Sequence, residues 1–209
     1  MPRGVFITFE GGEGTGKSTQ VARLARRLEG LGREVVTTRE PGGSPGGEAI
    51  RALLVSGAVD RWSALSEALL MNAARRDHVE RVIRPALARG AWVICDRFAD
   101  SSRAYQGVAG GVDLGVIAAL ETAVVGETRP DLTLILDLPI ALGLARAASR
   151  PGAEARFEAK GEAFHSQLRD AFLEIAGREP ERCRVIDAGG DPDAVEARIW
   201  AAEESRLQA

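Results

Sequence analysis

The sequence lacks long apolar runs and a strong excess of one charge. Its 209 residues contain no run of about 18 apolar residues, the length that a membrane-spanning helix needs. The net charge is only −3 with both signs interspersed, which gives no argument for a nucleic-acid surface or an anionic-membrane surface. Internal repeats, low-complexity tracts and linkers are also missing. We therefore expect one domain, spanning residues 1–209, whose partners include neither nucleic acid nor membrane.

Cysteine is scarce as well. The chain has two cysteines, Cys95 and Cys183, and their spacing fits neither a metal site nor a disulfide framework. Cys95 lies in an apolar run, which indicates a small core residue in a protein of the reducing cytosol. The apolar run 5–9 follows Gly4 directly and leaves no room for a signal peptide. We expect a cytoplasmic protein.

The most informative stretch is a glycine-rich loop at residues 11–19, which fits the phosphate-binding pattern G-x-x-x-x-G-K-[ST]. It follows the apolar run 5–9, typical of a buried strand, and precedes a helical pattern at 20–31. Its glycines let successive N–H groups point at one anion, and the next helix adds its positive end. This phosphate loop predicts binding of a nucleoside triphosphate through Gly11, Gly12, Glu13, Gly14, Thr15, Gly16, Lys17, Ser18 and Thr19.

Two side chains of the loop have separate expected roles. Lys17 should bring a mobile positive charge to the β- and γ-phosphates, and the Ser18 hydroxyl can be a ligand of Mg²⁺. Two acids, Asp96 and Asp137, could complete the metal site, because each ends a buried strand on the side where the loop lies. We prefer Asp96, since Arg97 follows it; Asp137 precedes Leu138 and Pro139 and is interpreted as a helix-capping acid.

The rest of the chain alternates apolar runs with helical patterns. We expect strands at 5–9, 34–38, 91–95, 132–137 and 184–187, and helices at 20–31, 48–56, 63–89, 114–125, 139–150 and 192–207. Ser63 should cap the third helix, and Pro85 should kink it or end it early. This order predicts an α/β fold of the P-loop NTPase type: a doubly wound, parallel, five-stranded sheet with flanking helices.

Residues 147–161 form a small, polar segment that Pro151 and Gly152 interrupt. In a protein without a phosphate loop we would interpret it as a solvated surface turn. Because this chain has such a loop, we interpret the segment as a short lid that covers the phosphates during transfer.

The absence of certain motifs and modules narrows the class of protein that the phosphate loop predicts. A GTPase needs an Asn-Lys-x-Asp motif, and no Asn-Lys pair occurs in the chain. A motor or remodelling ATPase would be larger and carry partner-binding modules. A small kinase for a small molecule remains, with a nucleotide-dependent binding module, or a kinase for another monophosphate or a deoxynucleoside, as alternatives.

Several further motifs occur in one order along the chain: Phe-Glu-Gly at 9–11, Thr-Arg-Glu-Pro-Gly-Gly at 38–43, Ala-Ala-Arg at 73–75, Asp-Arg-Phe at 96–98, Ser-Ser-x-Ala-Tyr-Gln-Gly at 101–107 and Arg-Pro-Asp-Leu at 129–132. With the phosphate loop they make the chain resemble the thymidylate kinase family from Phe6 to Asp187. The resemblance implies a nucleoside monophosphate kinase domain that uses ATP and Mg²⁺ to convert thymidine monophosphate (dTMP) to the diphosphate (dTDP), a step of dTTP biosynthesis. It also implies a homodimer, formed through the helix 63–89.

The resemblance assigns roles to residues on both sides of the phosphate loop. On the acceptor side it implies Glu13 at the sugar 3′-hydroxyl, Arg39, Arg51 and Arg97 around the phosphate, Arg75, Ser102 and Gln106 at the thymine base, and Tyr105 against the deoxyribose. On the donor side it implies that Arg146 stacks on adenine and that the turn after Asp187 closes that pocket. Arginine suits these roles because its planar fork of donors matches a phosphate or a base carbonyl.

Two positions depart from the family. Met71 stands where members often have a phenylalanine stacked on thymine, and its sulfur can pack there less rigidly. Gly14 stands where some members carry a basic residue, so the transition-state cation is assigned to the lid residues Arg150 and Arg156, as in the bacterial arrangement. The expected catalytic residues are Glu13, Lys17, Arg97, Arg150 and Arg156.

Overall fold

A five-stranded parallel sheet organises the chain, in a computed structural model that describes residues 3–149, 155–158 and 160–207. The strands are β1 (Phe6–Glu10), β2 (Val35–Arg39), β3 (Trp92–Asp96), β4 (Leu132–Asp137) and β5 (Cys183–Asp187). Their order is β2-β3-β1-β4-β5, and all four pairings are parallel. The fold predicted from the alternation of apolar runs and helical patterns is confirmed.

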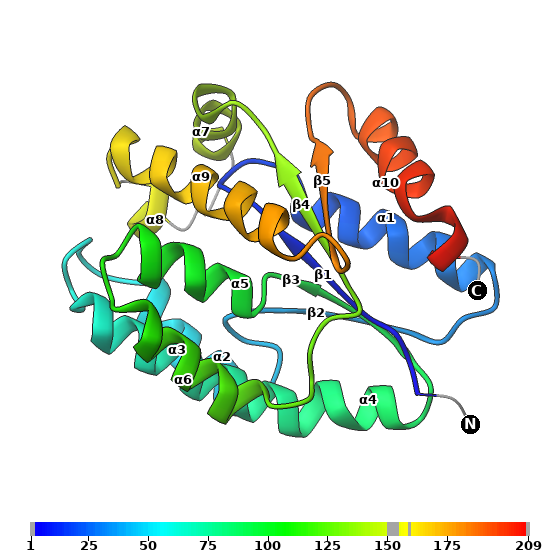
Figure 1. Cartoon of the computed structure of the whole chain (residues 1–209), viewed down its shortest axis with the longest axis horizontal. Coiled ribbons are helices and arrows are strands. Elements are labelled where there is room, and N and C mark those ends of the chain that lie inside the picture. The colour runs from blue at the N-terminus through cyan, green and yellow to red at the C-terminus, as the bar shows by residue number, and fades with distance from the viewer. Residues whose placement is uncertain (1–2, 150–154, 159, 208–209) are drawn as a thin grey trace.

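Helices cover both faces of the sheet (Figure 1). Their bounds are α1 (Lys17–Gly30), α2 (Pro45–Val55), α3 (Ala64–His78), α4 (Arg84–Ala88), α5 (Ala99–Ser102), α6 (Leu114–Val125), α7 (Ile140–Ala148), α8 (Ala155–Glu158), α9 (Glu162–Arg178) and α10 (Pro192–Leu207), with two π-helical segments, η1 (Val79–Ile83) and η2 (Arg103–Val108). One apolar cluster joins the sheet to α1 and α10, a second joins it to η1, α4 and α6, and a third packs α9 against η2. β1 and β4 are buried along almost their whole length, as expected for strands covered on both faces.

The long helix predicted at 63–89 is interrupted. Ser63 caps α3 as expected, its hydroxyl accepting from the Ser66 N–H. Ahead of Pro85 the chain widens into η1, where the Arg84 N–H donates to the Val79 carbonyl. Because Pro85 has no N–H and its ring crowds the preceding turn, one wider turn lets the helix continue into α4.

Most other differences from the expected elements are small, although α9, with 17 residues, had no range assigned to it. α2 begins at Pro45 because Ser44 caps it, its hydroxyl accepting from the Gly47 N–H, a start hidden in the Gly/Pro-rich loop. β1, β2 and β3 are displaced by one residue from their expected ranges, β5 begins one residue earlier than expected, and α7 ends at Ala148. The Ser-Ser-x-Ala-Tyr-Gln-Gly motif, to which no element was assigned, forms part of α5 and η2.

The parallel arrangement gathers the functional segments at one edge of the sheet. The phosphate loop follows β1, the central strand, and Glu40 follows β2. Asp96 ends β3 and Arg97 follows it, and the turn to α7 follows β4. Open α/β sheets place ligands at this edge. No helix of the described residues combines the length and the apolar character needed to cross a membrane.

Candidate active site

The phosphate loop has the backbone that its glycines predicted. Gly11, Gly14 and Gly16 have φ values of 130°, 68° and 89°, a region that other residues avoid. No side chain caps the first turn of α1, whose N–H groups therefore face the loop. The ammonium of Lys17 folds back over the loop and donates to the carbonyls of Gly11 at 3.2 Å and Gly12 at 2.7 Å. The loop is shaped as an anion cradle with a cation at its centre.

Gly14 has a second constraint, which comes from α7. A Cβ atom on Gly14 would lie 1.9 Å from the carbonyl oxygen of Gly143, and one on Gly143 would lie 2.6 Å from the carbonyl of Glu13. Two glycines thus allow the loop and α7 to touch through their backbones. This contact explains in physical terms why the loop of this chain has no basic side chain at position 14.

The two residues expected at the metal site lie together. The Ser18 hydroxyl donates to Asp96 Oδ2 at 2.5 Å, at the mouth of the phosphate loop. No group of three or more His, Cys, Asp or Glu side chains suited to a metal gathers anywhere in the described ranges. A cation at Ser18 and Asp96 would therefore need phosphate and water oxygens as its other ligands, which is the coordination that Mg²⁺ favours beside nucleotides.

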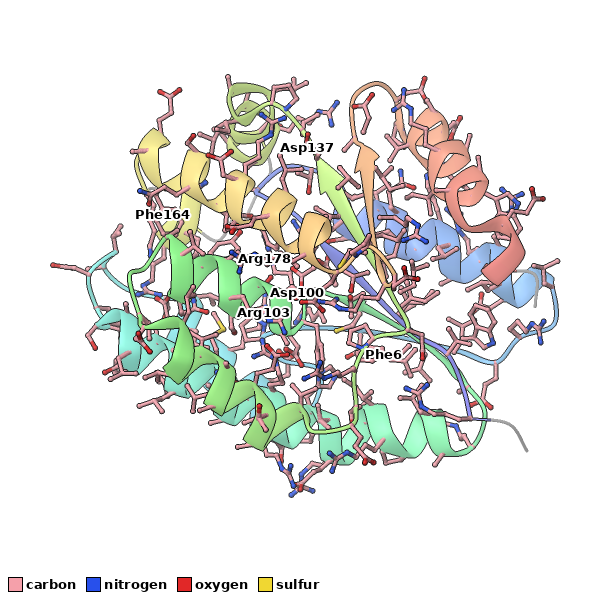
Figure 2. The ribbon with its side chains drawn as sticks, in the orientation of Figure 1. Phe6, Asp100, Arg103, Asp137, Phe164 and Arg178 are labelled. Atoms are coloured by element: carbon pink, nitrogen blue, oxygen red, sulfur yellow. The ribbon has the colours of Figure 1, made fainter. Side chains whose placement is uncertain are left out.

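Asp137 has a different role from the one predicted. It lies at the end of β4 (Figure 2), and Arg169 of α9 binds it in a bidentate pair, Nε to Oδ1 at 2.7 Å and Nη2 to Oδ2 at 2.8 Å. α7 begins after Pro139 without a side-chain cap. The interpretation of Asp137 as a helix-capping acid was wrong, because a partner 32 residues away in sequence occupies both of its oxygens.

Arg97 is held at the centre of the site by a strained turn. Its φ of 69° makes it the one non-glycine residue of the described ranges in the left-handed region. Its guanidinium donates to the Gly11 carbonyl at 3.0 Å and to Glu13 Oε1 at 3.0 Å, and lies 4.9 Å from the Tyr105 ring centroid. The turn therefore aims a fixed positive charge at the phosphate loop.

Glu13 is the acidic counterpart of this charge. Its Oε1 also accepts the Tyr105 hydroxyl at 2.6 Å. Burial by itself would raise the pKa of Glu13, but Arg97 and Lys17 outweigh it and lower that pKa to about 2. Glu13 is therefore an ionised acceptor, suited to a hydroxyl group of a ligand.

Glu10, which the sequence reasoning missed, supports the Arg97 turn from below. Its fully buried carboxylate accepts from the N–H groups of Phe98 at 2.8 Å and Ser101 at 3.2 Å and from the Ser101 hydroxyl at 2.6 Å. Burial, followed by the charge of Asp100, raises the pKa of Glu10 to about 7. The sequence does show an acid at the end of a strand, next to a glycine-rich loop. It could not show the role of Glu10, because the hydrogen-bond partners of that residue lie 88 to 91 residues away.

A hollow of about 400 Å³ opens beside Glu13; we call it the Arg75 hollow. It is lined by Glu13, Glu40, Pro41, Met71, Arg75, Arg97, Phe98, Ser101, Ser102, Tyr105, Gln106 and Phe157. These include every residue predicted for the acceptor except Arg39 and Arg51. Arg51 donates to the carbonyl of the lining residue Pro41 at 2.6 Å, and Arg39 pairs with Glu48 at 3.2 Å, both from the rim.

A second hollow, of about 590 Å³, lies on the other side of the loop; we call it the Arg146 hollow. It is lined by Gly14, Thr15, Gly16, Thr19, Gln20, Arg146, Ala188, Gly190, Pro192 and Val195. Arg146 donates to the carbonyls of Ala188 at 3.3 Å and Gly190 at 3.2 Å, which fixes its guanidinium against the turn after β5. The phosphate loop thus contributes residues to both hollows.

Comparison with known proteins agrees with this geometry. The thymidylate kinase family model matches residues 9–199. The chain is 66% identical to the thymidylate kinase of Caulobacter vibrioides over 99% of both chains, and 57% identical to that of Nitrobacter winogradskyi over 98% of this chain and 90% of the relative. The chain belongs to the thymidylate kinase family. A crystal structure of thymidylate kinase from Ehrlichia chaffeensis has a TM-score of 0.79 at 36% identity, covering 97% of this chain and 99% of that one.

The segment predicted to form a lid, residues 147–161, is described only in part. Arg150 lies outside the described residues. Arg156 is buried on α8, where it pairs with Glu67 of α3 at 2.6 Å and donates to the carbonyls of Leu54 at 3.1 Å and Ala58 at 3.2 Å. Its neighbour Phe157 lines the Arg75 hollow and meets Tyr105 edge to face at 5.8 Å. Within this segment, α8 thus packs on the side of the Arg75 hollow.

Lys17 should make ATP binding dependent on pH. Burial, followed by the nearby charge of Arg97, lowers the pKa of Lys17 to about 8. Because a lowered lysine pKa means that the charge is present below that pH and lost above it, ATP affinity should be flat below about pH 8 and fall above it by up to about tenfold per pH unit. Calorimetric titration with ATP between about pH 7 and about pH 9.5 measures this change.

The matched control is Lys17→Arg, whose guanidinium keeps its charge throughout this range. Its ATP affinity should not fall above pH 8, whatever its absolute value. An equal decline in the parent and in Lys17→Arg would contradict the assignment of the titration to Lys17.

Proposed function

We propose that this chain, as a thymidylate kinase, transfers the γ-phosphoryl group of ATP to dTMP, giving ADP and dTDP, with the residues around the phosphate loop in the roles below. The observation that carries the proposal is that one loop contributes to two hollows, with Glu13 in the Arg75 hollow and Gly14 to Gly16 in the Arg146 hollow. A donor in one hollow and an acceptor in the other would present their phosphates to the same loop.

On the donor side, the backbone of the phosphate loop and Lys17 hold the ATP phosphates, and Arg146 stacks on adenine. Ser18 and Asp96 would hold Mg²⁺, which would supply positive charge to neutralise the phosphates. The side chains contribute position and charge here, since phosphoryl transfer needs little covalent chemistry from the protein.

On the acceptor side, ionised Glu13 accepts a hydrogen bond from the 3′-hydroxyl of dTMP, and the ring of Tyr105 packs against the deoxyribose, where it leaves little space for a 2′-hydroxyl. Arg97 binds the acceptor phosphate, with Arg39 and Arg51 at the rim. The fixed contact of Arg97 with the Gly11 carbonyl supports this role, because it keeps the cation beside the phosphate loop.

Arg75, Ser102 and Gln106 bind the thymine base, and Met71 packs on it. All four line the Arg75 hollow. Arg75 is 3% exposed and donates to Glu40 Oε2 at 2.7 Å, Ser102 Oγ at 3.0 Å and the Phe98 carbonyl at 2.9 Å. A guanidinium held in one position can discriminate between bases, because it cannot move to form hydrogen bonds with a base whose groups are placed differently.

The direct test is a coupled ADP-release assay with ATP, Mg²⁺ and a panel of nucleoside monophosphates, for the parent and for Arg75→Ala. In the parent, dTMP should give by far the highest turnover of the panel. In Arg75→Ala, kcat/KM for dTMP should fall by roughly 10- to 100-fold while KM for ATP stays unchanged, because a base carbonyl loses a charged donor. Background rates across the whole panel would instead favour a nucleotide-binding module without an acceptor.

The lid arginines Arg150 and Arg156 supply the cation that Gly14 cannot, when the lid closes. To reach the phosphates, Arg156 must first break its ion pair with Glu67. The contact between Arg156 and the phosphates is therefore made mainly in the reacting state. We expect Arg156→Ala to lower kcat by at least about 10²-fold and to change the Kd values of ATP and dTMP only several-fold.

Arg156→Lys is the control, because it keeps the charge and loses the planar fork; its kcat should lie between those of the parent and the alanine variant. Arg150→Ala is measured beside it. Near-parental kcat in both alanine variants would remove the lid arginines from catalysis. Equal losses of binding and rate in Arg156→Ala would indicate instead that Arg156 has a structural role, attaching α8 to α3.

We also propose that the protein is a homodimer. α3 and α6 pack side by side and expose several large apolar side chains: Leu65 and Leu69 on α3, and Leu114 and Val116 on α6. Adjacent helices with such side chains form a surface suited to a second copy of the chain. Light scattering tests this, and a species of 22.2 kDa would contradict it.

We place the protein in the cytoplasm. Both cysteines are buried free thiols, which suits a reducing compartment, and ATP is available there. Fractionation of cells that express the chain tests this placement; recovery with membranes or in the medium would contradict it.

A further inference from the structure

A buried carboxylate behind the Arg75 hollow is shared by two side chains of one helix. Glu40 follows β2 and is 5% exposed. Its Oε2 accepts from Arg75 Nε at 2.7 Å, and its Oε1 lies 2.9 Å from His78 Nδ1. Arg75 and His78 are three residues apart on α3 and therefore lie on the same face of that helix.

His78 does not line the hollow and is fully buried. Its second nitrogen, Nε2, lies 2.7 Å from Thr38 Oγ1. Because an ionised carboxylate only accepts hydrogen bonds, Nδ1 carries a proton and donates to Glu40, while Nε2 shares a hydrogen bond with the Thr38 hydroxyl. A hydrogen-bonded chain thus runs from the strand β2 through His78 to Glu40 and Arg75.

The opposite edge of the Arg75 guanidinium is also fixed. Nη1 donates to Ser102 Oγ at 3.0 Å and to Asn72 Oδ1 at 3.3 Å, and Nη2 donates to the Phe98 carbonyl at 2.9 Å. With Nε on Glu40, four of the five N–H donors have partners among the described residues. The fifth, on Nη2, is left for a base that enters the hollow.

The geometry of Glu40 contrasts with that of Asp137 in the same molecule. Arg169 donates to both oxygens of Asp137 in a bidentate pair, through Nε and Nη2. Arg75 binds Glu40 through Nε alone, at Oε2, while His78 Nδ1 lies 2.9 Å from Oε1 and Arg75 Nη2 donates to the Phe98 carbonyl. Without His78, Oε1 would be available to Nη2, and the pair would close into the bidentate form that arginine and carboxylate prefer.

We propose that His78 is a positioning residue for recognition of the acceptor base: by holding Glu40 Oε1, it keeps Arg75 monodentate and leaves one Nη2–H for thymine. This inference rests on the proposed role of Arg75 as the residue that binds the base. His78 touches no substrate, and its effect is transmitted through Glu40.

Two substitutions at His78 separate its two hydrogen bonds. The amide nitrogen of asparagine can take the place of Nδ1 and keep the bond to Glu40, whereas glutamine reaches the place of Nε2, towards Thr38, and releases Glu40. We expect His78→Gln to raise KM for dTMP about tenfold and to reduce the preference for dTMP over dCMP about tenfold, because cytosine presents an amino group where thymine presents a carbonyl. KM for ATP should stay within about twofold, and His78→Asn should restore both acceptor values to within about threefold of the parent.

The measurement is steady-state kinetics of the parent and both variants with ATP, dTMP and dCMP, together with their melting temperatures. Each variant loses one bond of the chain, so both should melt lower by a similar amount. A merely structural His78 would give the two variants equal kinetic changes, or a KM for ATP that rises in parallel with KM for dTMP; either result would overturn the inference.

A second pair keeps the test decisive if His78→Gln does not fold. Thr38→Val removes the hydroxyl that fixes Nε2, and Thr38→Ser keeps it. KM for dTMP should rise about threefold in the first and not in the second; equal values in both would contradict the inference. A parent that shows no turnover with dTMP would instead refute the proposed function, while a parent active on dTMP with unchanged His78 and Thr38 variants would refute only the role of His78.

Discussion

The site depends on a backbone constraint at the phosphate loop. Three glycines place the loop in conformations that side-chain-bearing residues avoid, and Gly14 packs its backbone directly on Gly143 of α7. This contact turns Glu13 towards the Arg75 hollow and leaves Gly14 to Gly16 facing the Arg146 hollow. The phosphate loop thus lies between the Arg75 hollow and the Arg146 hollow and contributes residues to both.

Buried carboxylates then fix the cations around this loop. Glu10 ties down the turn that carries Arg97, Glu13 pairs with Arg97 itself, and Glu40 holds Arg75. Each acid lies at or just after the end of β1 or β2, so the parallel sheet supplies the anchors from one edge. Charges fixed before a ligand arrives need little rearrangement during the reaction, which is how electrostatic preorganisation assists phosphoryl transfer.

Much of this arrangement could be predicted from the sequence. The bounds of α6, β4 and α10 were predicted correctly; β4, for example, is a mostly apolar run that ends at an acid. The phosphate loop and most of the residues lining the Arg75 hollow followed from motifs whose chemistry is local or shared with a family. Two strand ends offered an acid near Ser18, and Asp96 was preferred to Asp137 because Arg97 follows it.

The remaining features arise from contacts between distant segments. η1 and η2 differ from an ordinary helix only in their backbone hydrogen bonds, so apolar spacing does not distinguish them from one. Asp137 was assigned the wrong role because its partner, Arg169, lies on another helix. Glu10 and His78 were missed for the same reason: a buried polar residue becomes informative only once its hydrogen-bond partners are known.

The central claim is that one phosphate loop receives a donor nucleotide from one hollow and an acceptor from the other. Calorimetric binding of a single compound that joins adenosine to thymidine through a polyphosphate chain tests it most directly. The account predicts one molecule bound per chain, displacement of both ATP and dTMP, and a Kd at least about 100-fold below that of either nucleotide, because the second half binds at high effective concentration. A Kd no lower than that of the tighter single nucleotide, or two molecules per chain, would contradict the account.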